Sequence, residues 1–190
     1  MLRVLAPATA AVMLAGCGIN SVPASEENAK ARWADVQAAY QRRADLIPNL
    51  VATVRGAARA ENETLTNVIN ARSRATAVQV SPDQLTDPNR VQQFAAAQAA
   101  LSVALRPIQE AYPQLQSQQG FQTLLSQLEG TENRINIAVR DYNQAVQEYN
   151  TRIRTFPDAI GARVIHGAKP LTPFQAVTPG AERAPQVNFN

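Results

Sequence analysis

Apolar residues recur at intervals of three, four and seven over most of the chain, which is the spacing of amphipathic helices. The first such stripe follows Ser25, whose hydroxyl and the two glutamates after it suit a helix start. Its apolar members are Trp33, Val36, Tyr40, Ile47, Leu50, Val54 and Ala58. A shorter stripe around Leu65 and Val68 follows and fades by Val80. The pattern therefore predicts two helical segments before the first strong turn signal.

Two further helices are predicted after the proline-containing turn signals at 81–83 and 86–88. One begins near Asn89, and Pro107 inside it should kink it before Pro113 ends it. The last helix, 121–156, has the clearest stripe. Its apolar positions are Leu124, Leu128, Ile135, Ala138, Tyr142, Val146, Tyr149, Ile153 and Phe156. The aromatic members of this stripe are expected in a hydrophobic core rather than in a ligand site.

Long helices with short connectors and one apolar stripe each predict an all-α fold, an elongated antiparallel helical bundle of about four helices. A helix of about 36 residues would span about 54 Å, so the body should be a rod. We assign residues 25–157 to this bundle. Residues 158–190 contain several prolines and are predicted to be an extended, irregular C-terminal tail. Scattered apolar residues in this tail, including Leu171 and Phe174, leave open whether it docks on the bundle.

The N-terminus has the features of a lipoprotein signal peptide over residues 1–16. Its apolar run of about a dozen residues is too short for the roughly 20 that cross a bilayer. The run ends in Leu14-Ala15-Gly16-Cys17, which resembles the lipobox of bacterial lipoprotein precursors, and Cys17 is the only cysteine. The alternative is an ordinary secretory signal followed by an incidental cysteine. We expect lipidation of Cys17, with the membrane as a partner through the lipid.

Residues 17–24 are predicted to be a lipid-anchored tether between the membrane and the bundle. Gly18 follows Cys17, whereas an aspartate there would favour retention at the inner membrane by analogy with enterobacterial sorting. We therefore expect a periplasmic-side, membrane-anchored lipoprotein, with the outer membrane favoured if the cell is Gram-negative.

Composition removes several classes of function. The formal charge of +3 is small and its positive and negative residues are interspersed, so nucleic acid is not an expected partner. The chain has one cysteine and one histidine, His166, which lies in the tail. The acids Glu129 and Glu132 suggest a carboxylate–metal site, but di-iron bundles pair glutamates with helical histidines. We therefore predict no cofactor, no metal site and no catalytic residues.

Polar residues interrupt the apolar stripes of the first and last helices at 40–51 (YQRRADLIPNLV) and at 128–134 (LEGTENR). Pro48 should bend or break its helix, because proline removes a backbone donor and clashes with the preceding turn. In antiparallel helices the two interruptions would lie at about 30–36 Å and about 33–41 Å from one end. We predict that Arg42, Arg43, Asp45 or Asn49 meets Glu129, Glu132 or Arg134. Such a network would set the register of the bundle or dock a partner.

These same residues carry a family resemblance. The stretches 40–51 and 128–135, with Arg140-Asp141-Tyr142-Asn143, Tyr149-Asn150 and the tail residues Ala184-Pro185-Gln186-Val187, resemble the LemA family of bacterial membrane-attached proteins. The resemblance implies an antiparallel bundle, usually on one N-terminal transmembrane helix, for which this chain has a lipobox instead. It implies no catalytic residue or cofactor.

The expected function is that of a non-enzymatic scaffold or protein-interaction module of the cell envelope, with an unidentified envelope protein as partner. The alternative is an envelope enzyme, or a regulator of envelope hydrolysis, that uses a carboxylate cluster of Glu129, Glu132 or Asp45. A closed polar core would favour the module, and a solvent-open cleft of converging carboxylates would favour the alternative.

Overall fold

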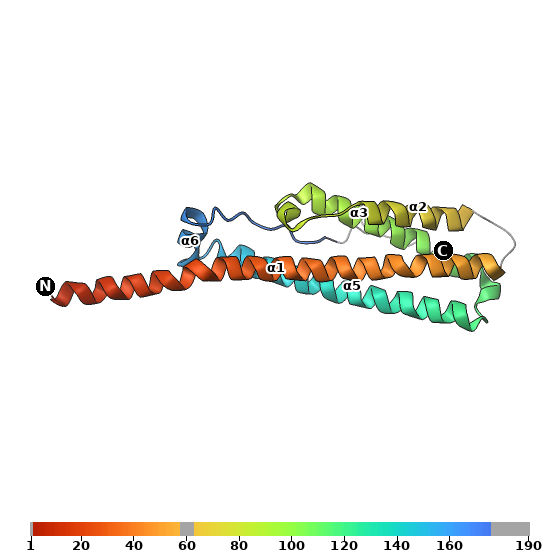
Figure 1. Cartoon of the computed structure of the whole chain (residues 1–190), viewed down its shortest axis with the longest axis horizontal. Helices are drawn as coiled ribbons and strands as arrows, with labels where there is room; N and C mark the ends of the chain where they lie inside the picture. The colour runs from red at the N-terminus through yellow and green to blue at the C-terminus, as the bar shows by residue number, and fades with distance from the viewer. Residues whose placement is uncertain (1, 58–62, 176–190) are drawn as a thin grey trace, which may run out of the picture.

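Two long antiparallel helices form the axis of the molecule (Figure 1). The computed structural model describes residues 2–57 and 63–175, and within them the side chains from Asn20 onward except those of Ala57 and Gln109. Helix α1 (Leu2–Ala57) packs along α5 (Gln119–Arg152), while α2 (Glu63–Ala77) and α3 (Pro88–Leu105) lie side by side in a second layer. The described residues contain no strand, which confirms the elongated all-α bundle.

Short elements connect these helices, and local sequence determines their bounds. They are η1 (Pro82–Thr86), α4 (Pro107–Ala111), η2 (Pro113–Leu115) and α6 (Asp158–Val164). The Asp87 carboxylate accepts a hydrogen bond from the Asn89 backbone N–H at 2.9 Å and so caps α3. Pro107 separates α3 from α4 rather than bending one continuous helix, because it cannot donate the next helical bond.

The predicted helix start at Ser25 was wrong, and α1 does not break at Pro48, where a bend or a break was predicted. Helix α1 begins at Leu2 and continues through both positions, so the predicted tether, residues 17–24, is helical. The Ser25 hydroxyl donates back to the Val22 carbonyl at 2.9 Å instead of capping a helix start. Burial of Val22 and Ala29 against the rest of the bundle keeps this stretch helical, since tertiary packing outweighs cap preference.

The end of the last helix also differs from the prediction. Helix α5 stops at Arg152, so the helical period no longer carries Phe156 into the core, and its side chain is 82% exposed. The tail is not irregular from residue 158, because α6 follows and packs on α1. Buried Gly161 and Ala162 allow that close approach, and the Ser21 hydroxyl donates to the Asp158 carboxylate at 3.0 Å.

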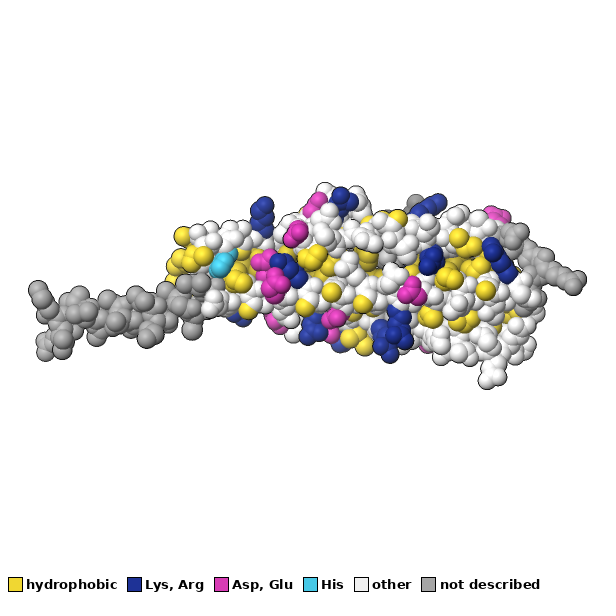
Figure 2. All heavy atoms as spheres, viewed as in Figure 1, with side chains coloured by type: hydrophobic (Ala, Val, Ile, Leu, Met, Phe, Trp, Pro, Cys, Tyr) yellow, Lys and Arg dark blue, Asp and Glu magenta, His cyan; other side chains and the backbone are white. Residues whose placement is uncertain are grey.

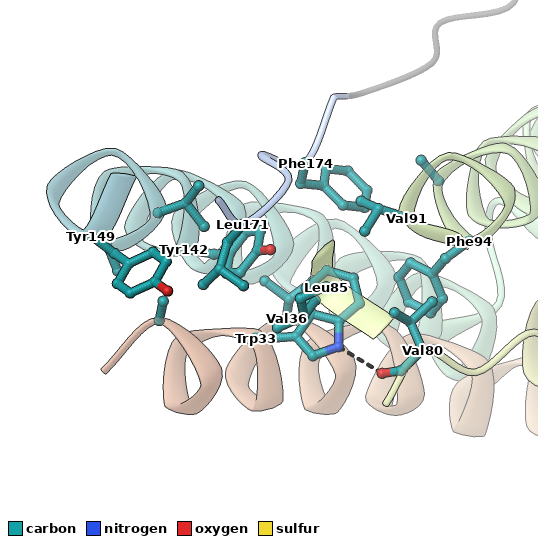
Figure 3. Packing of buried hydrophobic residues seen from close by; sticks show 14 of the residues in the cluster. Trp33, Val36, Val80, Leu85, Val91, Phe94, Tyr142, Tyr149, Leu171 and Phe174 are labelled. Carbon is teal, nitrogen blue, oxygen red and sulfur yellow. Dashed lines mark hydrogen bonds between the residues drawn. The ribbon is translucent and has the colours of Figure 1, made fainter. Parts of the chain in front are cut away.

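The hydrophobic interior is divided into two cores along the rod. The proximal core, nearest α6, contains Trp33, Phe94, Tyr142 and Phe174, and the Trp33 indole N–H donates to the Val80 carbonyl at 2.9 Å (Figure 3). The distal core lies toward the α1–α2 connection. Its buried members are Ile47, Leu50, Val51, Val54, Leu65, Val68, Ala75, Leu101, Ile108, Tyr112, Leu115 and Phe121.

Candidate functional site

A polar layer separates the two cores. On α1 the proximal core ends at Tyr40 and the distal core begins at Ile47, and Arg43 lies between them. Three side chains of α3 and α5 reach Arg43 at this level, namely Gln98, Ser102 and Glu132. We call Arg43, Gln98, Ser102 and Glu132 the arginine layer.

Arg43 is the centre of this layer and is only 3% exposed. Its Nη1 donates to the Ser102 hydroxyl at 2.8 Å and to the Glu132 carboxylate at 3.1 Å. Its Nη2 donates to both the backbone carbonyl and the side-chain oxygen of Gln98, at 3.1 and 3.2 Å. The Gln98 amide in turn donates to the Ala75 carbonyl near the end of α2. One guanidinium therefore links α1 to α3 and α5, and through Gln98 to α2.

The charge of Arg43 is compensated by its surroundings. Burial lowers the pKa of the guanidinium, and the Glu132 carboxylate acts in the opposite direction. The guanidinium carbon also lies 5.0 Å from the centre of the Tyr40 ring, within the range of a cation–π contact. Burial raises the pKa of Tyr40 to about 12, while Arg43 opposes that rise. Arginine stays charged even when buried, so the layer holds a permanent cation.

The layer meets solvent at Glu132. Glu132 is 51% exposed at its outer edge, whereas Gln98 is buried. A cavity of about 200 Å³ borders Arg43 and Glu132 between α3 and α5, and Phe174 of the tail lines it as well. The Arg43 Nε is buried and has no hydrogen-bond partner within the described part of the chain. The arrangement can fix helices relative to one another, and its one carboxylate is already bound to a cation.

Pro48 is connected to this layer through the carbonyl that it leaves without a partner. In an α-helix the N–H of residue 48 would bond to the carbonyl of residue 44, and proline has no N–H. The Arg72 Nε of α2 donates instead to the Ala44 carbonyl at 2.8 Å. The helix therefore continues because a side chain from a neighbouring helix replaces the missing donor.

Of the seven residues predicted to form a network, the structure brings together two, Arg43 and Glu132. Asp45 accepts a hydrogen bond from Gln41 on its own helix at 2.7 Å. The remaining four are exposed and lie outside the layer. They are Arg42, Asn49, Glu129 and Arg134. Successive residues of an α-helix point about 100° apart, so a side chain next to a buried position in the sequence can point to solvent.

A second polar site, which the sequence reasoning missed, holds the tail on α5. Asn143 and Asn150 each donate to a tail carbonyl and accept from the N–H of the same residue, Phe174 and Leu171 respectively, at 2.7–2.9 Å. The hydroxyls of Tyr142 and Tyr149 donate to two further tail carbonyls. We call residues 168–175 the tail strap.

The sequence contained a signal for this site. The dipeptide Tyr-Asn occurs at 142–143 and again at 149–150, and a spacing of seven places both copies on one helix face. Each asparagine amide satisfies both backbone groups of one residue, as a neighbouring strand would. Leu171 and Phe174 are each 4% exposed, so the strap is docked through buried side chains as well as through its backbone amides.

These features define a class of protein: an all-helical rod with an internal arginine layer between two hydrophobic cores and a tail that is docked on α5. Within the described residues, no group of three His, Cys, Asp or Glu side chains could hold a metal ion. No described helix is both long enough and apolar enough to cross a bilayer.

The chain belongs to the LemA family, whose model matches residues 32–189. The matched range begins one residue before Trp33 and includes the whole arginine layer and the tail strap. A search of curated proteins found no match.

Proposed function

We propose that this protein is a lipid-anchored, non-enzymatic scaffold or interaction module of the cell envelope. The observation that carries the proposal is the engagement of the central polar groups with one another. The Glu132 carboxylate is bound to buried Arg43, and the Asp45 carboxylate is bound to Gln41. Neither of these two carboxylates is held as an unpaired acid or base, and Glu129 is exposed outside the layer, so no cluster of converging carboxylates supports the alternative of an enzyme.

The anchor in this proposal is Cys17, which ends the lipobox-like sequence. Two or three acyl chains supply about 0.8 kcal/mol per buried methylene, enough for stable anchorage. In a Gram-negative cell we expect the periplasmic face of the outer membrane, since no aspartate follows Cys17. The helix that carries this cysteine continues into the bundle without interruption.

The rod would hold its distal end away from the membrane for a protein partner. Helix α5 contains 34 residues and therefore spans about 51 Å. The arginine layer and the tail strap resist sliding of the helices, so the partner would meet a surface of fixed shape.

Fractionation and affinity capture test the two parts of this proposal. We expect the wild-type chain in the membrane fraction with acyl chains on Cys17 by mass spectrometry, and loss of both the acyl chains and stable membrane anchorage for Cys17→Ser. Crosslinking of the wild-type chain in intact cells should capture a defined envelope protein, with Cys17→Ser as the control. An unmodified Cys17 would contradict the anchor. A hydrolytic activity of the purified chain that disappears in Glu132→Gln would contradict the scaffold.

A further inference from the structure

Exposed apolar side chains gather around α6. Among the side chains that the structure describes, seven large hydrophobic residues are exposed, and four of them lie within ten positions: Phe156 at 82%, Ile160 at 60%, Val164 at 80% and Ile165 at 57%. We call these four residues the apolar foot. Soluble proteins seldom expose such a group unless something covers it.

The foot lies at one end of the rod, beside α1. Figure 1 shows α6 at the end of the bundle where the N-terminal part of α1 leaves it, and Figure 2 shows hydrophobic side chains at that end. Phe156, Ile160 and Val164 are spaced by four, which puts the latter two on one face of the short helix.

Basic residues surround the foot in the sequence. The segment 152–169 carries Arg152, Arg154, Arg163 and Lys169 against the single acid Asp158, a net charge of 4 − 1 = +3. All four of these basic residues are exposed at 36% or more. The Arg152 guanidinium also lies 3.7 Å from the Asp158 carboxylate. Apolar side chains beside cations are the composition of segments that lie in the headgroup layer of anionic membranes.

Geometry places the foot at the level of the proposed anchor. The Ser21 hydroxyl bonds to Asp158 in the first turn of α6. Cys17 precedes Ser21 by four residues of continuous helix, which is a rise of about 6 Å. Interfacial segments are buried about 5–10 Å into the headgroup and acyl boundary. A lipid on Cys17 would therefore bring the foot to the membrane surface.

We propose that the apolar foot inserts into the headgroup layer of an anionic lipid bilayer. Its placement rests on the proposed anchorage at Cys17, although its affinity for lipid does not. With the foot inserted, the rod has two attachments to the membrane, one through Cys17 and one through α6. Two attachments fix the tilt of the rod, which a single lipid anchor would leave free.

The test uses a label on the foot of the chain that begins at position 17, as the lipidated protein would. Cys17→Ser removes the only cysteine, so Val164→Cys can carry a single polarity-sensitive fluorophore, and a histidine tag placed directly before position 17 holds the chain on vesicles. The vesicles contain phosphatidylethanolamine, phosphatidylglycerol and a small share of nickel-chelating lipid. The matched control is Ser126→Cys, an exposed position on the distal half of α5. We expect a lipid-borne quencher to act about fivefold more on the label at 164 than at 126.

Charge reversal provides the second arm. Arg154→Glu with Arg163→Glu should reduce lipid-borne quenching at 164 about fivefold, whereas Arg90→Glu with Arg134→Glu, two exposed arginines elsewhere, should leave it unchanged. If a water-soluble quencher acts on the label at 164 and the lipid-borne quencher does not, the proposal is overturned. Self-quenching of the label without vesicles would also overturn it, because that would show that a second copy covers the foot. Because the tag replaces the natural lipid, failure of Cys17 lipidation leaves this result unaffected.

Discussion

The two halves of the rod are built in different ways. In the proximal core the aromatic rings pack on one another, with Trp33 at 5.3 Å from Phe94 and 5.1 Å from Tyr142 between ring centres, and Phe174 of the tail beside them. The distal core is mainly aliphatic, with Tyr112 and Phe121 as its aromatic members.

The difference lies in how far apart in sequence the packed residues are. The proximal core joins α1, the stretch from Val80 to Phe94, α5 and the tail strap, so it depends on long-range contacts. The distal core joins helices that are mostly consecutive in the chain. We infer that the two halves can lose their structure separately, because only the proximal half depends on contacts between distant parts of the chain. We also infer that the arginine layer couples the stability of one half to that of the other.

The largest expected effect comes from Trp33→Ala. Trp33 is fully buried, and the substitution removes both its ring contacts and its hydrogen bond to the Val80 carbonyl. The free energy of unfolding should therefore fall by about 4 kcal/mol. Leu50→Ala in the distal core should cost about 3 kcal/mol. Ile137→Ala, at a position 51% exposed, is the control and should change stability by less than about 0.5 kcal/mol.

Chemical denaturation measures the unfolding free energy of each variant. Hydrogen exchange, followed separately for the proximal and the distal half, shows which half loses amide protection. If Trp33→Ala removes amide protection from the proximal half before the distal half, the two halves are separate units of stability. Equal loss of protection in both halves would show that the rod is one cooperative unit and that the distinction has no energetic meaning.

The second prediction concerns the boundary between the halves. Arg43→Ala removes the buried guanidinium that links three helices and leaves the buried side-chain oxygen of Gln98 without its donor, so we expect a loss of about 3 kcal/mol by chemical denaturation. Glu132→Gln should cost about 1 kcal/mol, because solvent reaches this half-exposed carboxylate. The adjacent exposed residue provides the control, since Arg42→Ala should cost less than about 0.5 kcal/mol. A small cost for Arg43→Ala would mean that the layer does not couple the halves.

The part of the fold that could be predicted is the part that the helical repeat of apolar residues determines. The stripe in the last helix and the antiparallel arrangement follow from helix rise alone, and the same arithmetic put Arg43 and Glu132 at one level. Gln98 could not be predicted, because the register of the third helix depends on packing rather than on its own sequence. The role of this pair in setting register stays a prediction.

The errors at Ser25 and Pro48 share one cause, which is that packing overrides local signals, whereas the error at Phe156 concerns where a helix ends. Ser25 has every feature of a helix start, yet buried Val22 extends α1 past it. Pro48 has the feature of a break, yet Arg72 supplies the missing donor from a different helix. Phe156 continues an apolar stripe, yet the helix ends before it. The lipobox-like sequence lies where side chains are not described, so lipidation of Cys17 stays a prediction.

The third prediction tests whether the tail strap belongs to the proximal half alone. Asn150→Ala removes both hydrogen bonds to Leu171, a loss of about 1–2 kcal/mol that should appear as local opening. Hydrogen exchange at the amides of Leu171 and Phe174 should become at least about tenfold faster while the distal half is unchanged. Gln147→Ala, an exposed position between the two asparagines, should have no effect. Faster exchange throughout the rod would assign the strap a global role.

The smallest expected effect is a coupling between Pro48 and Arg72, measured in a double-mutant cycle by chemical denaturation. In the wild-type chain Arg72→Met leaves the Ala44 carbonyl without a donor and should cost about 2 kcal/mol. In a Pro48→Ala background the alanine N–H can bond to that carbonyl, so the same change should cost about 1 kcal/mol less. The control is Arg74→Met, an exposed position on the same helix, for which the cost should not depend on residue 48. Equal costs in both backgrounds would mean that α1 passes through Pro48 for some reason other than the hydrogen bond from α2.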